Sequence, residues 1–288
     1  MEAQIAPSLT CDGELNMDRM KLLVTTAPTL KWCIITLVLV CLLPTSVSIA
    51  LSHSARAEQI TERIEDLEAR ARAIQCGELA AHVIALPHST LTVSPAIPLT
   101  VLAIGSSSTS GVGAGSDALS YPKGVERTLR HIYPDWQINV HAYGVGGETA
   151  EGALSRLPQL ITQIKPSIVI WQVGTNDALR KSISFDQFRL DLQMGERIVS
   201  SIDAQLIFVD PQFFPKIKEN SRYRQFVDEV RDFALQRGHS VVRRYTRMRA
   251  AEERIDELLA ADRFHMSALG HVCLALDIAA VMTATSLP

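Results

Sequence analysis

Short apolar runs alternate with amphipathic segments over residues 98–288. The runs are rich in β-branched residues and predict strands at 99–104, 137–143, 167–173, 205–209 and 240–242. In the intervening segments apolar residues recur at helical spacing, which predicts helices at about 120–133, 150–165, 185–201, 221–237 and 267–284. Continuous apolar strands separated by helices indicate a parallel sheet covered on both faces. We therefore expect a three-layer α/β/α domain with a five-stranded parallel sheet that binds ligands at the carboxyl ends of its strands.

The chain before this domain contains an apolar segment. Residues 1–31 show no periodic pattern, whereas residues 32–51 carry no charge and are long enough to cross a bilayer. Small residues near its end, Ser48-Ile49-Ala50, suit a signal peptidase, and a start at Met20 would shorten the region before it. A cleaved signal and an uncleaved transmembrane anchor both remain open. Either predicts an exported or membrane-anchored protein, with residues 98–288 periplasmic or extracellular.

A charged, alanine-rich segment follows at residues 57–81. It carries an apolar stripe at alternating steps of four and three, formed by Ile60, Ile64, Leu67, Ala71 and Ile74. This pattern predicts a membrane-proximal amphipathic helix that either packs on the following domain or forms a weak homodimer. Because two heptads are marginal for a coiled coil, packing is favoured. Residues 82–97 are rich in proline, serine and threonine, which indicates an extended connector.

The composition limits the partners that we expect. The chain has 28 basic and 31 acidic residues with no long run of either sign, so nothing favours nucleic acid as a partner. The expected partner is a small or neutral molecule. The five cysteines form no CxxC pair, and we predict neither a disulfide framework nor a zinc site. Cys76 and Cys273 are compatible with an oxidising compartment, as a bridge or as free thiols.

The first predicted strand ends in a turn rich in small hydroxyl residues, Gly105-Ser106-Ser107-Ser108-Thr109-Ser110-Gly111. A nucleophilic serine needs such a turn, because its hydroxyl must project while backbone N–H groups face the reacting carbonyl. A phosphate-binding loop would need a lysine that is absent, and a dinucleotide fingerprint would need a third glycine where Ser116 stands. Neither nucleotide interpretation is supported, and the turn alone does not distinguish catalysis from an ordinary loop.

Two later strands also end in polar loops. The second runs into a glycine-rich turn that contains Gly147, and the third into Gly174-Thr175-Asn176-Asp177. Glycine allows a backbone N–H to approach an oxyanion closely, and an asparagine amide can donate to the same oxygen. An ordinary glycine turn and a helix cap are the alternatives.

An aspartate and a histidine precede the last predicted helix. Asp262 stands three residues before His265, where its carboxylate can accept the ring N–H and fix the tautomer that takes a proton from serine. His271 competes as the base but has no acid at matching spacing, so we predict that it is a helix residue. Asp262, His265 and His271 lack a recognised metal-ligand spacing, and we expect no metal and no cofactor.

As a set, the segments GSSST, GVGGET, GTND and DRFH resemble the four sequence blocks of SGNH/GDSL hydrolases, from about residue 99 to the C-terminus. The resemblance implies an SGNH, flavodoxin-like fold. It also implies that Ser107 is the nucleophile, that His265 is the general base and that Asp262 orients it. The backbone N–H of Ser107, Gly147 and Asn176 would form the oxyanion hole.

One departure from the family pattern affects this assignment. The usual aspartate before the nucleophile is Ser106 here, so three adjacent serines are candidates. Ser107 is assigned by its register with Gly105 and Thr109. Phe213 or Phe214, after the fourth predicted strand, would either line a substrate pocket or anchor their loop in the core.

The resemblance predicts a serine hydrolase that cleaves carboxylic esters of lipid or carbohydrate through an acyl-enzyme. An envelope O-acyltransferase would use the same site but pass the acyl group to a sugar hydroxyl. A non-catalytic, membrane-tethered binding module on the same fold is the third hypothesis. It predicts a broken set of catalytic residues, whereas all five positions are occupied by competent residues.

Overall fold

The computed structural model describes residues 54–77, 83–84, 95–218 and 220–285. The chain divides into two units, Met1–Ile60 and Thr61–Pro288, and the fold belongs to the second. The apolar segment that predicts a membrane anchor or signal, residues 32–51, lies outside the described residues. In the described part of the chain, no helix has both the length and the apolar character needed to cross a membrane.

A parallel sheet forms the centre of the domain. Its five parallel strands are β2 (Leu99–Gly105), β3 (Ile138–Gly144), β4 (Ile168–Gln172), β5 (Gln205–Val209) and β6 (Ser240–Val242). They lie in the order β6-β5-β4-β2-β3 and confirm the predicted five-stranded parallel sheet. Every residue of β4 and β5 is buried, as their continuous apolar sequences require.

The sheet has one more strand than the sequence predicts. β1 (Val83–Ile84) pairs antiparallel with β6 at the edge of the sheet. It lies inside the predicted connector 82–97, whose proline content is compatible with a short edge strand but not with a long interior one. The predicted extended connector therefore includes a two-residue edge strand.

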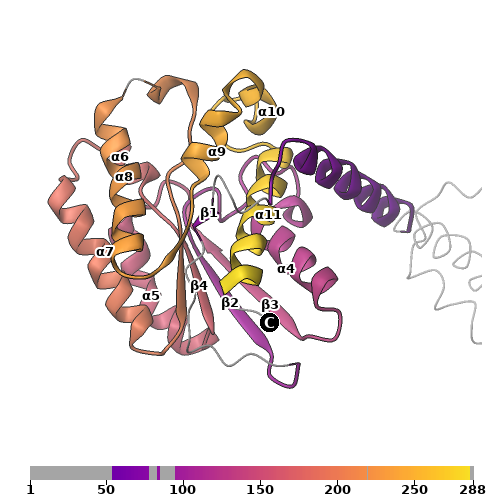
Figure 1. Ribbon diagram of the computed structural model, residues 1–288, viewed down its shortest axis with the longest axis horizontal. Helices are drawn as coiled ribbons and strands as arrows, with labels where there is room; N and C mark the ends of the chain where they lie inside the picture. The colour runs from indigo at the N-terminus through magenta and orange to yellow at the C-terminus, as the bar shows by residue number, and fades with distance from the viewer. Residues whose placement is uncertain (1–53, 78–82, 85–94, 219, 286–288) are drawn as a thin grey trace, which may run out of the picture. The chain divides into compact units, whose positions relative to one another are not determined.

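Helices cover both faces of the sheet (Figure 1). One face carries α4 (Tyr121–Ile132) and α11 (Ala268–Thr285), and the other carries α5 (Ala150–Ile164), α7 (Phe185–Ser200) and α8 (Ser221–Gln236). The side chains of Thr149, Ser184 and Asn220 cap α5, α7 and α8 by accepting a backbone N–H from the first turn. The three-layer prediction is confirmed.

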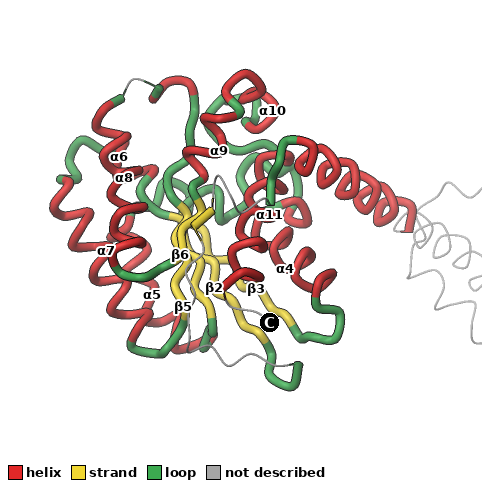
Figure 2. Tube along the Cα trace, viewed as in Figure 1, coloured by secondary structure: helices red, strands yellow, loops and turns green. Residues whose placement is uncertain are grey.

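The carboxyl ends of the strands lead into loops and short elements (Figure 2). These elements are α6 (Thr175–Leu179), α9 (Arg244–Ala250), α10 (Ile255–Leu258) and the 3₁₀ turns Asp117–Leu119, Pro215–Ile217 and Glu252–Arg254. β2 lies between β3 and β4. The chain passes from β2 to β3 on one side of β2 and then crosses to β4 on the other side, so the strand order reverses at β2. In open α/β sheets, ligands bind at such a reversal point.

The predicted amphipathic segment is a helix over residues 54–73. Within the second unit, Leu67 and Ala71 are buried in the core, and Ile64 and Ile74 pack against it. The apolar stripe therefore packs on the domain, as favoured from the sequence. A weak homodimer through residues 57–81 stays a prediction.

A disulfide bond joins Cys76, just after this helix, to Cys273 in α11. Of the two states that the sequence leaves open for these cysteines, a bridge and free thiols, the structure shows the bridge. The two cysteines are 197 residues apart and belong to no sequence motif, so only the packing of α11 against the preceding segment brings them together. Beside the bridge, the backbone N–H of Gly77 donates to Asp277 Oδ1 at 2.7 Å.

Candidate active site

The loop after β2 presents one of its three adjacent serines to solvent. Ser106 and Ser108 are 3% and 4% exposed, whereas Ser107 is partly exposed. The backbone N–H and the hydroxyl of Ser106 both donate to Gln172 Oε1 at 2.9 Å. Ser108 Oγ accepts a hydrogen bond of 3.0 Å from Arg244 Nη1. Ser107 is thus the serine of the three whose hydroxyl is placed to meet a substrate.

The loop after β3 lies against the loop that carries Ser107. The backbone N–H of Val145 donates to the carbonyl of Gly105 at 3.0 Å, and a Cβ on Gly144 would collide with the backbone nitrogen of Ser110. Gly147 has a φ of +75°, a left-handed conformation that favours glycine. Within the described residues, the N–H groups of Ser107 and Gly147 have no hydrogen-bond acceptor. Two donors therefore remain available to a bound oxyanion.

Asn176 lies in the first turn of α6, immediately after β4, and is partly exposed. Its Nδ2 donates to the carbonyl of Glu148 at 2.8 Å, which holds the amide beside the Gly147 turn. A primary amide has a second N–H, which leaves a third donor at this edge of the sheet. The next residue, Asp177, accepts the N–H of Ala150 at 2.8 Å, and burial raises the pKa of Asp177 to about 6. These contacts join the β4 loop to the start of α5.

Asp262 and His265 form a tight turn before α11. His265 Nδ1 lies 2.5 Å from Asp262 Oδ2, and Asp262 Oδ1 accepts the N–H groups of Phe264 and His265 at 2.9 Å. The hydrogen bond with His265 lowers the pKa of Asp262 to about 2, so the carboxylate stays ionised. It therefore binds Nδ1–H of the ring and leaves Nε2 as a proton acceptor. Arg263, with a φ of 53°, provides the reversal of this turn.

The turn that contains His265 packs against the Ser107 loop. A Cβ on Gly113 would collide with the carbonyl oxygen of Met266, so the two loops are in backbone contact. No hydrogen bond joins Ser107 to His265 among the described residues, and such bonds often form only when substrate binds. The structure thus places the candidate base and nucleophile on touching loops.

His271 lies in α11, as predicted, and is fully buried. Its Nδ1 accepts the N–H of Tyr121 at 3.3 Å, and its Nε2 lies 3.0 Å from the carbonyl of Val112. These partners require a neutral ring protonated at Nε2, and burial lowers the pKa of His271 to about 4. With both nitrogens occupied, His271 holds the Ser107 loop on α11 and is a poor candidate base.

Sequence reasoning missed three polar residues at the ends of strands. Gln172 ends β4, Gln212 follows β5 and Arg244 follows β6, and all three are buried. Their positions were the available signal, because polar residues at the carboxyl ends of parallel strands meet at one edge of the sheet. Phe213 and Phe214 are buried, so both anchor their loop in the core.

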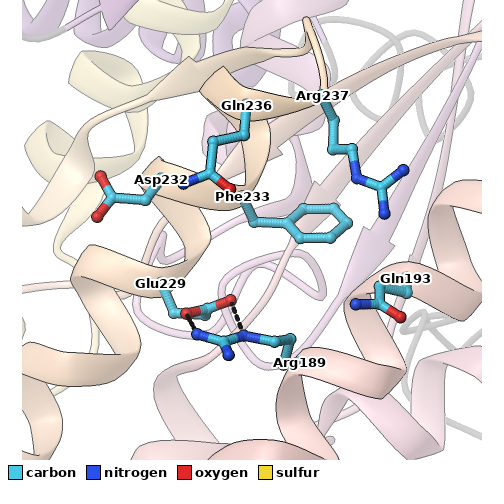
Figure 3. Close-up of a pocket in the computed structure, with 7 residues that line it drawn as sticks. All are labelled: Arg189, Gln193, Glu229, Asp232, Phe233, Gln236 and Arg237. Carbon is cyan, nitrogen blue, oxygen red and sulfur yellow. Dashed lines mark hydrogen bonds and ion pairs between the residues drawn. The ribbon is translucent and has the colours of Figure 1, made fainter.

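A surface hollow lies away from these residues, between α7 and α8 (Figure 3). It encloses about 340 Å³ and is lined by Arg189, Gln193, Glu229, Asp232, Phe233, Gln236 and Arg237. The Arg189–Glu229 ion pair, at 2.7 Å, crosses it. None of the candidate catalytic residues lines this hollow. Among the described residues, no group of three His, Cys, Asp or Glu side chains is arranged to hold a metal ion.

Comparison with known proteins supports the family resemblance that the sequence motifs indicate. The model of the Non-GDSL lipase-like family matches residues 75–286. No curated protein matches the chain.

Solved structures with the same fold include three esterases or lipases. A lipase/acylhydrolase from Enterococcus faecalis is 24% identical, covers 64% of this chain and 95% of its own, and gives a TM-score of 0.53. An acetyl xylan esterase from Geobacillus stearothermophilus is 22% identical, with coverages of 64% and 94% and a TM-score of 0.54. A lipase from a goat rumen metagenome is 18% identical, with coverages of 66% and 100% and a TM-score of 0.54. At these identities the likeness shows the fold alone.

Proposed function

Because the chain belongs to the Non-GDSL lipase-like family, we propose that it hydrolyses carboxylic esters through an acyl-enzyme on Ser107. The observation that carries this proposal is the hydrogen bond of 2.5 Å between His265 Nδ1 and Asp262 Oδ2. It orients a histidine whose other nitrogen accepts a proton. This histidine lies on a loop in contact with the β2 loop, where Ser107 is the partly exposed one of the three adjacent serines. This combination is what nucleophilic catalysis by serine requires.

In the proposed reaction, His265 Nε2 removes the proton of Ser107, and Oγ attacks the ester carbonyl. The N–H groups of Ser107 and Gly147 and the amide of Asn176 stabilise the oxyanion that forms. Protonated His265 then gives its proton to the leaving alcohol, and the acyl group stays on Ser107. Water, activated by the same histidine, releases the acid and restores the enzyme.

An apolar acyl group suits the surroundings of the site. Val112 and Val145, which are 41% and 46% exposed, lie on the loops that carry Ser107 and Gly147. Leu179, which is 41% exposed, lies with Asn176 in α6. Exposed aliphatic side chains next to polar catalytic groups are typical of a site for a partly apolar small molecule. These side chains support our proposal that the substrate is an acyl or acetyl ester of a lipid or carbohydrate.

The proposal also includes an exported or membrane-anchored location. The apolar segment 32–51 supports export, and the Cys76–Cys273 disulfide adds support because such bridges persist in oxidising compartments.

A panel of substrates tests the proposed function. Full-length protein is incubated with p-nitrophenyl esters of increasing chain length and with acetylated sugars, with and without an added sugar acceptor. We expect release of the acid at a rate that the acceptor does not change. Acyl groups on the added sugar would instead show an O-acyltransferase. No release from any ester, with no adduct at Ser107 after treatment with a fluorophosphonate, would contradict the proposal.

A further inference from the structure

Arg244 is a buried arginine beneath the candidate active site. It is 2% exposed and begins α9, two residues after the end of β6. Its Nη1 donates to Ser108 Oγ at 3.0 Å, its Nη2 to Thr175 Oγ1 at 3.4 Å, and its Nε to the carbonyl of Asp210 at 3.1 Å. Ser108 follows the candidate nucleophile and Thr175 precedes Asn176. One guanidinium therefore holds the neighbours of two candidate catalytic residues.

A chain of hydrogen bonds continues from Arg244 to the candidate base. Ser108 Oγ, which accepts from Arg244, donates in turn to Gln212 Oε1 over a long contact of 3.5 Å. Gln212 Nε2 then donates to the carbonyl of Phe264 at 2.6 Å, one residue before His265. The Ser108 hydroxyl and the Gln212 amide each accept one hydrogen bond and donate the next. The Ser107 loop and the His265 turn are thus connected to the same guanidinium.

We propose that Arg244 is a positioning residue that holds Ser107, Asn176 and His265 in the relative positions that acyl transfer requires. This inference rests on the proposed function. The planar fork of arginine directs its donors to separate acceptors at the same time. Lysine would bring the same charge as a single point on a flexible stem. Displacements of about 1 Å in a catalytic site can cost about 100-fold in rate. Loss of the Arg244 hydrogen bonds should therefore have a measurable kinetic effect.

A second buried arginine on α9 provides a matched control. Arg247, one turn later and 4% exposed, forms a two-pronged ion pair with Asp277 at 2.9 and 3.0 Å. By contrast, Arg244 makes no salt bridge in the described part of the chain. Arg247 stabilises the packing of α11, whereas the partners of Arg244 lie on the loops of the site. Replacing each arginine with methionine distinguishes two effects. Loss of stability is expected at Arg247, and loss of the relative positions of Ser107, Asn176 and His265 is expected at Arg244.

The test measures kcat and KM on a short-chain p-nitrophenyl ester, with active sites titrated by a fluorophosphonate. We expect Arg244→Met to lower kcat about 100-fold with KM changed less than about threefold, because it displaces catalytic groups rather than substrate contacts. Arg244→Lys should restore only part of kcat. Arg247→Met should lower the melting temperature and keep the wild-type kcat per titrated site.

Two milder variants keep the test decisive if Arg244→Met does not fold. Ser108→Ala and Thr175→Val each remove one acceptor of Arg244, and each should lower kcat without raising KM. When each is combined with Arg244→Lys, the losses in kcat should be less than additive, because both substitutions break the same set of hydrogen bonds. Wild-type kcat in both variants, or equal kcat in Arg244→Met and Arg247→Met, would overturn the positioning role. An inactive wild type that no fluorophosphonate labels would overturn the proposed function itself.

Discussion

Ser106 stands where SGNH hydrolases usually have an aspartate, and the structure shows how the turn forms without it. The hydroxyl and the backbone N–H of Ser106 share Gln172 Oε1, so a neutral side chain at the end of β4 holds the turn. The same arrangement buries Ser106 and leaves Ser107 partly exposed. A neutral serine therefore supports the turn here, and Ser107 is partly exposed beside it.

His271 predicts a pH dependence of stability. Its pKa is about 4 in the folded protein, against 6.5 for an ordinary histidine, because the ring is buried and neutral. Between these values the unfolded chain binds the extra proton, so this contribution to stability is present above pH 6.5 and is lost as the pH falls towards 4. The shift corresponds to about 3 kcal/mol.

The measurement compares urea unfolding of wild type and His271→Gln at pH 6.5 and pH 4.5. Burial raises the pKa values of Asp177 and Asp210 to about 6 and about 7, so these carboxyl groups give slopes of the opposite sign. Only the difference between the two proteins isolates the histidine. We expect wild type to lose more free energy of unfolding than the variant on acidification, and parallel profiles would contradict the assignment.

At the scale of elements, a disulfide bond and a hydrogen bond fasten the segment before the sheet to α11, and a buried ion pair joins α9 to the same part of α11. Cys76 is bonded to Cys273, and Asp277, one turn later on α11, pairs with Arg247 and accepts the N–H of Gly77. Because Cys273 and Asp277 lie well inside α11, this junction stabilises the packing of that helix.

Removal of the disulfide should therefore destabilise the domain. Cys76→Ser/Cys273→Ser is expected to lower the free energy of unfolding by about 2–5 kcal/mol, as for other native disulfides. Calorimetry with and without reductant measures the effect. The wild-type melting temperature should fall in reductant, whereas that of the double variant should not change. A reductant-insensitive wild type with the melting temperature of the double variant would contradict this role.

Elements and motif residues were predictable because their signals are local. The apolar runs predicted β2 to β6, and the four loop motifs placed Ser107, Gly147, Asn176, Asp262 and His265 at one edge of the sheet. The Cys76–Cys273 bridge and the Arg244 contacts were not predictable, because they join residues far apart in the chain through packing alone. The antiparallel strand β1 was missed because two residues carry no periodicity.

At the scale of the whole molecule, the order of the strands determines where chemistry can occur. The strand order reverses at β2, which lies between β3 and β4, so the loops that carry Ser107, Gly147 and Asn176 meet at that reversal. The turn with Asp262 and His265 reaches the same edge after β6. A single sheet edge thus gathers residues that are up to 158 positions apart in the chain, from Ser107 to His265.

The most direct measurement of the central claim is the turnover of a short-chain p-nitrophenyl ester by single serine variants of the β2 loop. Ser107→Ala should lower kcat by at least about 10⁴-fold, because no other side chain replaces the nucleophile. Ser116→Ala, which alters an exposed serine of the same loop, should stay within about threefold of wild type. Wild-type turnover by purified Ser107→Ala would contradict the account.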